Sequence, residues 1–395
     1  MLLKKSVLFM LTSMNIGGVE KSLLALLSVI PRENYDITIL LLEKKGGFLS
    51  SIPKEIKVEE VGWFSKIKPL IMNSPYDVIN DLLRNKRIID GIRYIYSYLV
   101  SKHFNNRYLF YKTIMRDIPK ISGEYDIAIA YQGPTDIIDF FIAEKINARK
   151  KIAWVHFDVR NHKINSKLYN KIYTRFEKIR VVSKQGLLNL IEVVPSVEKK
   201  VEVFSNIVPI SEIKELAQKP IKFDEEYDGV KIVTVGRLSM EKGQDIAIKV
   251  LFRLKNEGYN IRWYCIGEGN DRKFYESLIE KYCLHNDFLL LGAMQNPYPY
   301  ILKSDIYVQT SRHEGYCLTL AEAKCLRKPI ITTNFVGAYE QITDEFNGLI
   351  VNCSENGIYS KVKSLIDDIS LRKNLVGNIE NQELNEIRKI ENVLR

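Results

Sequence analysis

The sequence predicts an α/β protein built from two doubly wound domains, each a parallel sheet covered by helices. The first observation is the length of 395 residues with 46% apolar residues, which is enough for two cores. The second is that short β-branched runs, apolar on both faces, alternate with segments of helical length, as buried parallel strands require. The third is a polar, proline-containing stretch, Ile207 to Gly229, that interrupts this alternation.

Each half of the chain contributes its own series of predicted strands. Those of the first half are Ser6–Leu11, Ile37–Leu42, Ile127–Tyr131, Lys151–His156 and Ile179–Ser183. Those of the second half are Lys231–Gly236, Arg262–Gly267, Phe288–Leu291, Ile306–Thr310, Pro329–Thr332 and Gly348–Val351. Between the latter we predict helices at Lys242–Asn256, Asp271–Tyr282, Pro297–Lys303 and Leu318–Leu326. The predicted domains are therefore 1–206 and 207–380, with the carboxyl ends of both sheets facing a cleft between them, and a terminal helix over 381–395 that returns to the first domain.

Composition excludes several classes of protein. The five cysteines contain no Cys-x-x-Cys pair and are odd in number, which is neither a disulfide framework nor a zinc pattern, and a reducing cytoplasm is expected. The apolar run after Lys4 and Lys5 is too short for a signal peptide, and no uncharged run approaches the roughly 20 residues that span a bilayer. The net charge of +10 predicts an anionic partner.

Two cations five residues apart follow the first strand of the second domain. The loop from Gly236 carries Arg237 and Lys242, followed by Gly243. A guanidinium and an ammonium there can grip a diphosphate from two sides. A solvated loop with a capping glycine explains this segment alone about equally well.

The segment Ser311 to Ala323 is the most informative of the chain. Gly315 permits close backbone approach beside Tyr316, and the amides of Leu318 and Thr319 form the exposed start of a helix, where anions bind readily. A phosphate there would complement the two cations of the Gly236 loop. The loop Gly267-Glu268-Gly269 follows the next strand and is a weaker candidate for the same ligand, because such glycines commonly mark only a turn.

Two glutamates flank the start of that helix. Glu322 falls about one turn into it, where a carboxylate can accept hydrogen bonds from two ribose hydroxyls, and Glu314 lies before it, nearer a reacting sugar. The alternative is that both only favour the helix dipole or a solvated surface.

Two features of the first domain are candidates for the same ligand. Gly17 and Gly18 follow the first strand and open a helix, so their amides can face a phosphate or sugar, although the third glycine of a dinucleotide-binding motif is missing. His156 ends a predicted strand and is a candidate for binding the transferred sugar, whereas a lone histidine is more often structural.

A basic stretch rich in aromatic residues runs from Arg84 to Lys120. It holds nine Lys or Arg, two Asp and seven aromatic residues, and a second basic stretch runs from Lys163 to Arg180. This composition suits an anionic membrane interface. A helical insertion with buried aromatics and solvated charges explains it equally well, and although single-stranded nucleic acid attracts such a composition, no nucleic-acid-binding motif is present.

Together these segments resemble the retaining glycosyltransferases of family four, which have the GT-B fold of two Rossmann-like domains. The resemblance rests on Gly236-Arg237-Leu238 with Lys242-Gly243, on Ile266 to Gly269, on Ser311 to Tyr316 with the Glu314-x7-Glu322 spacing, and on Lys328 to Ile331. One departure is Arg327, which stands where relatives often have glycine.

The resemblance implies transfer of a sugar from a nucleoside diphosphate donor, most often UDP-linked, with retention of configuration and without a metal or other cofactor. It implies Arg237 and Lys242 on the diphosphate, Glu314 on the donor sugar, Glu322 on the ribose and His156 on the transferred sugar. The expected acceptor is a saccharide or lipid-linked saccharide of surface polysaccharide or glycolipid synthesis, handled by a hexosyltransferase peripheral on the inner face of the plasma membrane. A UDP-sugar epimerase or phosphorylase of the same fold, or a non-catalytic partner protein, are the alternatives.

Overall fold

The chain divides into two compact units, which we describe separately. The computed structural model describes residues 4–121, 123–160 and 164–380. The first unit comprises the described part of residues 1–15 and 30–204, and the second that of 16–29 and 205–395. Helix α1 (Gly18–Val29) is thus counted with the second unit, whereas the sequence predicts one continuous domain over 1–206. The helix predicted over 381–395 lies outside the described residues.

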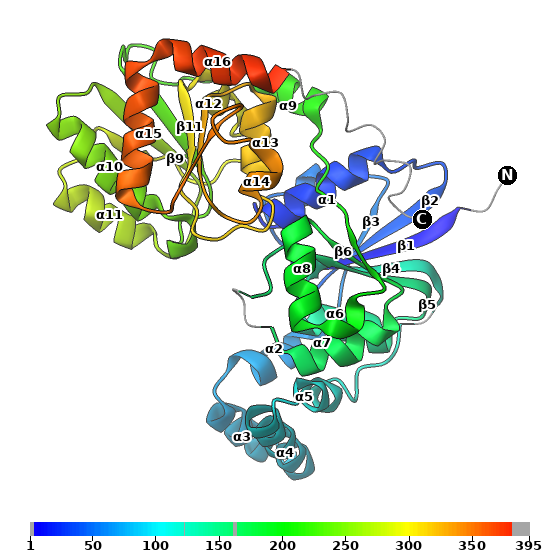
Figure 1. Ribbon diagram of the computed structural model, residues 1–395. Helices are drawn as coiled ribbons and strands as arrows, with labels where there is room; N and C mark the ends of the chain where they lie inside the picture. Colours follow the sequence, from blue (N-terminus) through cyan, green and yellow to red (C-terminus); the bar gives the residue numbers. More distant parts are fainter. Residues whose placement is uncertain (1–3, 122, 161–163, 381–395) are drawn as a thin grey trace. The chain divides into compact units, whose positions relative to one another are not determined.

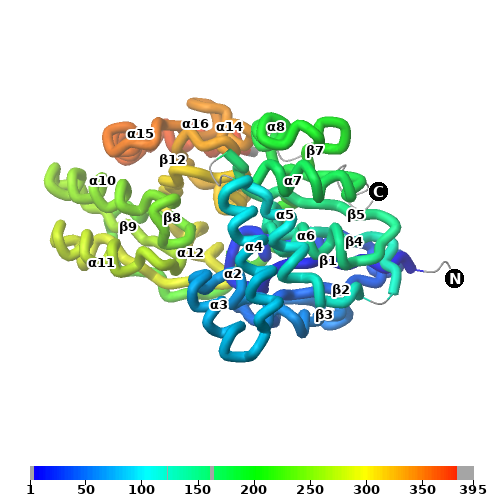
Figure 2. Tube along the Cα trace, turned by 90° about the horizontal axis from the view of Figure 1, so that it is seen from below, coloured from blue at the N-terminus to red at the C-terminus, as the bar shows by residue number. Residues whose placement is uncertain are grey.

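The first unit is built on a seven-stranded parallel sheet with the strand order β3-β2-β1-β4-β5-β6-β7. Figure 2 shows β3, β2, β1, β4 and β5 side by side in that order. The strands are β1 (Lys5–Leu11), β2 (Tyr35–Leu41), β3 (Lys57–Glu60), β4 (Tyr125–Gly133), β5 (Ala148–Val155), β6 (Lys178–Val181) and β7 (Val201–Val203). The sequence analysis misses β3 and β7, the two edge strands, because neither has the buried apolar run on which the prediction depends.

The second unit repeats the same strand order in a six-stranded parallel sheet, β10-β9-β8-β11-β12-β13. The strands are β8 (Val230–Val235), β9 (Ile261–Ile266), β10 (Phe288–Leu290), β11 (Ile306–Gln309), β12 (Ile330–Thr333) and β13 (Leu349–Val351). All six agree with the predicted strands to within one residue at either end. In the register of the central pair, Ile306 lies opposite Ile232 and Tyr307 opposite Val233.

Helices cover both faces of the second sheet (Figure 1). Alternate residues of one strand enter opposite cores, since Ile232 packs in one cluster and Val233 in the other. The first core includes α10 (Gln244–Asn256), α11 (Arg272–Lys281), α15 (Glu355–Asp367) and α16 (Ile369–Glu380). The second includes α9 (Ile210–Ala217), α12 (Tyr298–Lys303), α13 (Leu318–Cys325) and α14 (Ala338–Gln341). The predicted fold class, two doubly wound α/β domains, is therefore confirmed.

Helix α9 lies within the stretch that the sequence analysis interprets as a polar connection. Ile213 and Ala217 are buried in the core of the second unit, next to α12 and α13. Their spacing places them on one helical face, and the prolines at 209 and 220 only flank the helix. The prolines therefore mark the ends of an element in this stretch.

The first unit also carries a helical insertion between β3 and β4. It consists of α2 (Phe64–Met72), α3 (Pro75–Arg84), α4 (Ile88–Phe104) and α5 (Arg107–Ile114), of which α3 and α4 lie farthest from the sheet in Figure 1. The remaining helices of this unit are α6 (Asp136–Lys145), α7 (Ser166–Ile172) and α8 (Lys184–Val193). Among the residues described, no helix is both long enough and apolar enough to cross a bilayer.

Five of the seven aromatic residues between Arg84 and Lys120 pack into the first unit. Tyr94 and Tyr111 are buried, and Tyr98, Tyr108 and Phe110 are half-buried against the same core. These rings are core residues, as the helical-insertion interpretation expects. Only Tyr96 and Phe104 are largely exposed.

A buried carboxyl group in α6 makes the stability of the first unit depend on pH. Burial raises the pKa of Asp139 to about 8, although the Thr135 amide donates to it over 2.7 Å. The folded protein therefore keeps a proton that the unfolded chain loses near pH 4, and stability falls as the pH rises from about 4 to 8.

We expect Asp139→Asn to raise the melting temperature by several degrees at pH 8 and to have little effect at pH 4. Thermal unfolding at the two pH values measures this. If Asp139→Asn changes the melting temperature by the same amount at pH 4 and at pH 8, the ionisation of Asp139 is not the cause.

Candidate functional site

The loops that carry the predicted donor residues follow two adjacent strands of the second sheet. Strand β8 lies between β9 and β11, so the chain leaves β8 and β11 in opposite directions across the sheet. In open α/β sheets, ligands bind at the carboxyl ends of the strands at this point of reversal. Gly236 follows β8 and Ser311 lies just beyond β11, so both segments lie at this point.

Close backbone packing holds these loops together. A Cβ atom on Gly267, which follows β9, would lie 2.0 Å from the carbonyl oxygen of Gly236, and Gly267 has a φ of +150°. Gly243 has a φ of +68°, and a Cβ there would lie 2.2 Å from the Thr310 carbonyl oxygen. Glycine is required at both positions by space and by backbone conformation.

Lys242 and Glu314 form the centre of the site. The Lys242 Nζ lies 2.5 Å from the Glu314 Oε1, and both side chains are largely buried. Burial disfavours the ammonium ion, but the carboxylate of Glu314 outweighs burial and raises the pKa of Lys242 above its ordinary value. Lys242 therefore remains cationic at all physiological pH values, as the binding of a diphosphate requires.

A chain of buried hydrogen bonds fixes the carboxylate of Glu314. The Ser311 hydroxyl donates to Glu314 over 2.9 Å, and the Gln309 amide donates to Ser311 over 2.7 Å. The Tyr307 hydroxyl in turn donates to Gln309 over 2.7 Å. Because Tyr307 and Gln309 belong to strand β11 and Ser311 lies just beyond it, the end of this strand sets the position of Glu314.

A second ion pair fixes the loop that carries Lys242. The Arg312 guanidinium makes two 2.8 Å hydrogen bonds to Asp245 in the first turn of α10. The Arg312 amide donates to the Glu241 carbonyl over 2.7 Å, and the Thr310 hydroxyl donates to that of Lys242 over 2.7 Å. These contacts fix the two loops relative to each other.

Arg237 is exposed, and its charge acts on two neighbouring groups. Its repulsion of the Lys242 ammonium partly offsets the rise in the pKa of Lys242, and its attraction for the Glu20 carboxylate lowers the pKa of Glu20. Burial is the larger effect on Glu20 and raises its pKa to about 6. Arg237 is therefore available for a ligand close to Lys242, as the diphosphate hypothesis requires.

The segment before helix α13 has a strained backbone. Cys317 has a φ of +65°, which is unusual for a residue other than glycine, and the Gln341 side chain donates to the Tyr316 carbonyl oxygen. Gly315 is buried, and Leu318 and Thr319 form the first turn of α13, as predicted. The first amides of a helix have no acceptor within it, so those of Leu318 and Thr319 are candidates for binding an anion.

Glu322 lies in the second turn of α13 and is only 2% exposed. Its Oε1 lies 2.7 Å from the Nζ of Lys21 and accepts a hydrogen bond from Tyr298 over 3.4 Å. Its Oε2 is buried and has no hydrogen-bond partner among the described residues. A buried carboxylate oxygen without a donor is costly, and a ligand hydroxyl would satisfy it.

His156 follows β5 in the first unit and lies against aromatic rings. Its ring centroid is 4.8 Å from that of Tyr131, and burial lowers its pKa to about 3. Its Nε2 is buried and has no partner within the described part of the chain. A neutral imidazole of this kind is suited to hydrogen bonding a hydroxyl group and is a poor proton acceptor at neutral pH.

The other predicted site residues have simpler surroundings. Gly17 precedes α1, where a Cβ would lie 2.5 Å from the Glu20 carboxylate, and Gly18 is the first residue of α1. Glu268 is exposed and pairs with Arg272 of α11. Within the described ranges, no group of three or more His, Cys, Asp or Glu residues is placed to hold a metal ion.

The sequence analysis misses Lys21 and Glu20. Both follow Gly17-Gly18 in the first turn of α1, and the Lys21 ammonium also lies 4.5 Å from the centre of the Tyr298 ring. The pattern of one acid and one base two and three residues after Gly18 was a usable signal. What it contacts could not be predicted, because Glu322 and Tyr298 are distant in sequence.

Comparison with known proteins gives a consistent result. Residues 216–382 match the family described as "Glycosyl transferases group 1". The chain is 29% identical over 215 residues to an N-acetylgalactosamine-N,N'-diacetylbacillosaminyl-diphospho-undecaprenol 4-alpha-N-acetylgalactosaminyltransferase of Campylobacter jejuni, and the match covers 54% of this chain and 57% of that protein. It is 27% identical over 161 residues to the capsular polysaccharide biosynthesis glycosyltransferase CapM of Staphylococcus aureus, covering 39% and 42% of the two chains.

Solved structures extend the fold similarity to nearly the whole chain. The structure of Anabaena HepE in complex with UDP-glucose has a TM-score of 0.69 to this one at 16% identity, covering 98% of each chain. This similarity supports the GT-B fold for both units. The sequence match to the Campylobacter jejuni protein spans 57% of that protein's length.

Proposed function

We propose that the protein is a group 1 glycosyltransferase, the family that residues 216–382 match, and that it transfers a sugar from a UDP-linked donor to a saccharide or lipid-linked saccharide acceptor. The observation that carries the proposal is the geometry around Lys242, Glu314 and Glu322. These residues place a buried cation, a fixed carboxylate and an unsatisfied carboxylate oxygen at the carboxyl ends of one sheet. The UDP ligand of the structurally similar HepE and the polysaccharide products named for CapM support the choice of donor and pathway.

Each of the candidate site residues has a distinct task in the proposed reaction. Lys242 and Arg237 bind the diphosphate and stabilise the charge that develops as it leaves, so no metal is needed for this step. Glu314 holds the hydroxyls of the donor sugar, and Glu322 accepts hydrogen bonds from the ribose. His156, as a neutral imidazole, donates or accepts a hydrogen bond from the transferred sugar.

We propose that transfer retains the configuration of the donor sugar. The bond between the anomeric carbon and the phosphate oxygen breaks, and the acceptor oxygen bonds to the same face of that carbon. The acceptor's proton passes to the departing phosphate oxygen. Analysis of the anomeric configuration of the product by NMR tests this, because an inverted product would contradict it.

We also propose that the protein works at the cytoplasmic face of a membrane, where lipid-linked acceptors are found. The positive charge of the 84–120 stretch, with nine cations against two acids, supports this.

Nucleotide-induced stabilisation is the first test of the donor. We expect UDP at about 100 times its dissociation constant to stabilise the second unit by about 2.7 kcal/mol, which raises the melting temperature by several degrees. GDP and ADP at the same concentration serve as controls and should shift it less. If no nucleotide and none of a panel of nucleotide sugars gives stabilisation, hydrolysis or transfer, the protein is not a transferase of this kind.

A further inference from the structure

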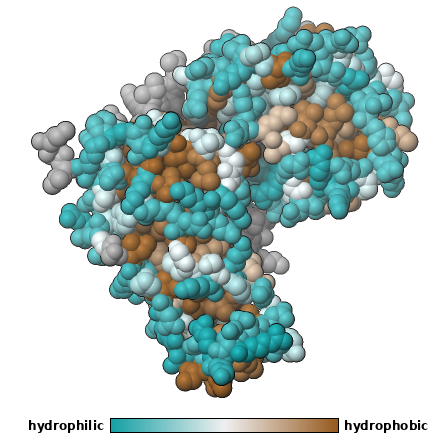
Figure 3. Space-filling view, turned by 180° about the vertical axis from the view of Figure 1, so that it is seen from behind, coloured by the Kyte–Doolittle hydropathy of each residue, from teal (hydrophilic) through white to brown (hydrophobic). Residues whose placement is uncertain are grey.

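An exposed apolar stripe runs along helix α4 of the first unit. Ile88, Ile92, Ile95 and Leu99 follow one another at spacings of four, three and four residues, so they lie on one side of the helix. Their exposed fractions are 57%, 63%, 36% and 45%, while Gly91, Tyr94 and Ser97 on the opposite side are buried. Surface helices normally bury such a stripe, so an uncovered one marks a contact surface. Figure 3 shows hydrophobic residues at the surface of this end of the first unit.

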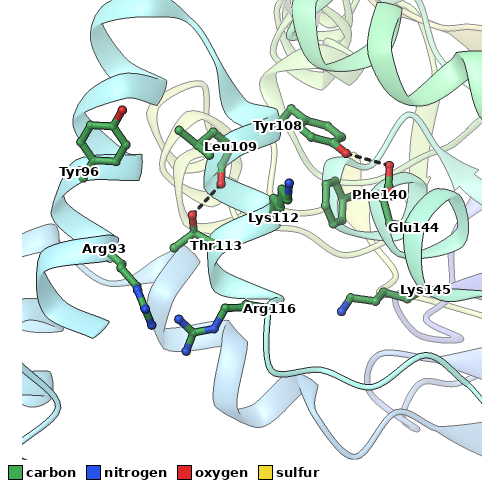
Figure 4. Close-up of a pocket in the computed structure, with 10 residues that line it drawn as sticks. All are labelled: Arg93, Tyr96, Tyr108, Leu109, Lys112, Thr113, Arg116, Phe140, Glu144 and Lys145. Carbon is green, nitrogen blue, oxygen red and sulfur yellow. Dashed lines mark hydrogen bonds between the residues drawn. The ribbon is translucent and has the colours of Figure 1, made fainter. Parts of the chain in front are cut away.

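A cationic pocket lies beside this stripe. It has a volume of about 520 Å³ and is lined by residues of α4, α5 and α6 (Figure 4). Four of its lining residues are cationic and one is acidic: Arg93, Lys112, Arg116, Lys145 and Glu144. Tyr96 of α4 lines the pocket and is 63% exposed, so its ring joins the pocket to the apolar stripe.

The acidic groups near the pocket are paired, and two of them, Asp90 and Asp117, pair with Arg116, one of the pocket's own cations. Glu144 accepts a hydrogen bond from Tyr108 over 3.0 Å and pairs with Arg175 at 2.9 Å. Asp117 and Asp90 pair with Arg116 at 2.9 and 3.3 Å. Arg93 reaches Asp90 only at 3.8 Å, and no ion pair of Lys112 occurs among the residues described.

The positions of three of these cations, Arg93, Arg116 and Lys145, favour an anion with several oxygens. Figure 4 shows Arg93 on α4 and Arg116, just after α5, directing their guanidinium groups toward one another, with Lys145 approaching from α6. The Asp90 carboxylate contacts both guanidinium groups, at 3.8 and 3.3 Å, so a further anion would use the N–H groups that Asp90 and Asp117 do not occupy. Lys145 donates to the Ile118 carbonyl oxygen over 2.5 Å, which fixes its ammonium at this side of the pocket. Guanidinium and ammonium groups on three elements match the acceptor oxygens of a phosphate.

We propose that this pocket binds the phosphate of an anionic membrane lipid while the apolar stripe of α4 enters the acyl layer beside it. The two features are complementary, because a lipid presents a phosphate at the same depth as the first methylene groups of its chains. A second protein fits this surface less well, since it would have to place an anionic group in the pocket and an extended apolar surface along the stripe beside it. The inference rests on the proposed membrane location and adds to it a specific site.

The stripe and the pocket are tested by separate variants of the full-length chain. Ile92→Gln with Ile95→Gln removes apolar area without changing charge, and Leu188→Gln, at a leucine of α8 that is 57% exposed, is its control. Arg93→Gln with Lys112→Gln removes two pocket charges, and Lys54→Gln with Lys199→Gln removes two exposed charges elsewhere in the first unit. Circular dichroism and thermal unfolding establish that all four variants fold.

Binding is measured by sedimentation with phosphatidylcholine vesicles that contain either phosphatidic acid or cholesteryl hemisuccinate at matched surface potential. The second lipid is anionic but has no phosphate. We expect the wild-type protein to prefer phosphatidic acid, and the stripe variant to bind both kinds of vesicle about tenfold or more weakly, because two isoleucines no longer enter the membrane. The pocket variant should lose about fivefold in affinity per removed charge on phosphatidic acid and its preference for that lipid, whereas the control pair should keep the preference.

The outcomes separate the site from membrane binding and from catalysis. Equal binding of the wild-type protein to both anionic vesicles, or a pocket variant that matches its control, overturns the phosphate site and leaves membrane binding intact. No binding to any vesicle overturns both. If inorganic phosphate at millimolar concentration abolishes the preference, the pocket takes free phosphate and the lipid assignment is wrong. UDP-induced stabilisation is expected to be unchanged in the pocket variant, so a failure of the proposed donor would be seen independently.

Discussion

Replacing Lys242 by alanine is expected to lower the turnover number of sugar transfer by about 10²- to 10³-fold, the loss typical for removal of one charge-stabilising donor from an active site. The ammonium of Lys242 is held by Glu314 at 2.5 Å and remains charged because that carboxylate raises its pKa. Without Lys242, the negative charge that develops on the departing diphosphate is left to Arg237, and the carboxylate of Glu314 has lost its counter-ion. The rate of bond cleavage should therefore fall more than the affinity for the donor.

The measurement is a comparison of kcat and KM for the donor that the nucleotide-sugar panel identifies. Lys273→Ala, at an exposed position of α11 in the same unit, is the matched control and should leave both values unchanged. Glu314→Gln tests the partner, because loss of its contact with the donor sugar should also reduce kcat. In the double variant the two losses should not add, since each single change already breaks the same ion pair.

Transfer at the wild-type rate by both Lys242→Ala and Glu314→Gln would show that the pair is structural. The hydrogen-bond chain from Tyr307 through Ser311 to Glu314 makes a structural contribution certain, so melting temperatures belong beside the rates. A primary amine added to the Lys242→Ala protein gives a further readout. Partial recovery of the rate would be expected only if the missing ammonium acts on the reaction.

Features that depend on a few neighbouring residues, such as strands and helix starts, can be predicted well from the sequence. The Glu314-x7-Glu322 spacing lies within one loop and one helix, so the placement of Glu322 in α13 followed from counting residues. The strands of the second sheet were equally predictable, since each is a short apolar run between turns. Arg327 is a further local feature: the resemblance places it where relatives often have glycine, and its φ of +54° is a conformation that favours glycine.

Contacts between distant segments were beyond prediction. Helix α1 is joined to β1, yet its Lys21 pairs with Glu322, and nothing in the local sequence specifies that partner. The helical insertion between β3 and β4 gives a similar example. The sequence indicates its aromatic residues as candidates for membrane contact, but packing buries most of them and leaves Ile92 and Leu99 exposed. Which apolar side of α4 is covered depends on α3 and α5, and hence on the tertiary structure.

The second large effect is expected at Glu322, on the affinity for the nucleotide. Two ribose hydroxyls that donate to a buried carboxylate contribute more than neutral hydrogen bonds, about 1.5–3 kcal/mol each. The free Oε2 of Glu322 is the acceptor that such a ligand needs, and Lys21 and Tyr298 already occupy Oε1. Glu322→Gln should therefore weaken UDP binding by about 10- to 100-fold, measured by calorimetry, while Glu280→Gln on the exposed side of α11 should not.

Loss of the Lys21 ion pair also disturbs the site in Glu322→Gln, so affinity for UDP alone does not identify the contact. Comparison of UDP with 2′-deoxy-UDP identifies the contact, because the two ligands differ only in the 2′-hydroxyl group of the ribose. The wild-type protein should bind the deoxy compound about tenfold more weakly, in accordance with one lost hydrogen bond to a charged acceptor. In Glu322→Gln the two ligands should bind with nearly equal affinity. If the discrimination persists undiminished in the variant, the ribose is bound elsewhere, and Glu322 serves only to hold α1 through Lys21.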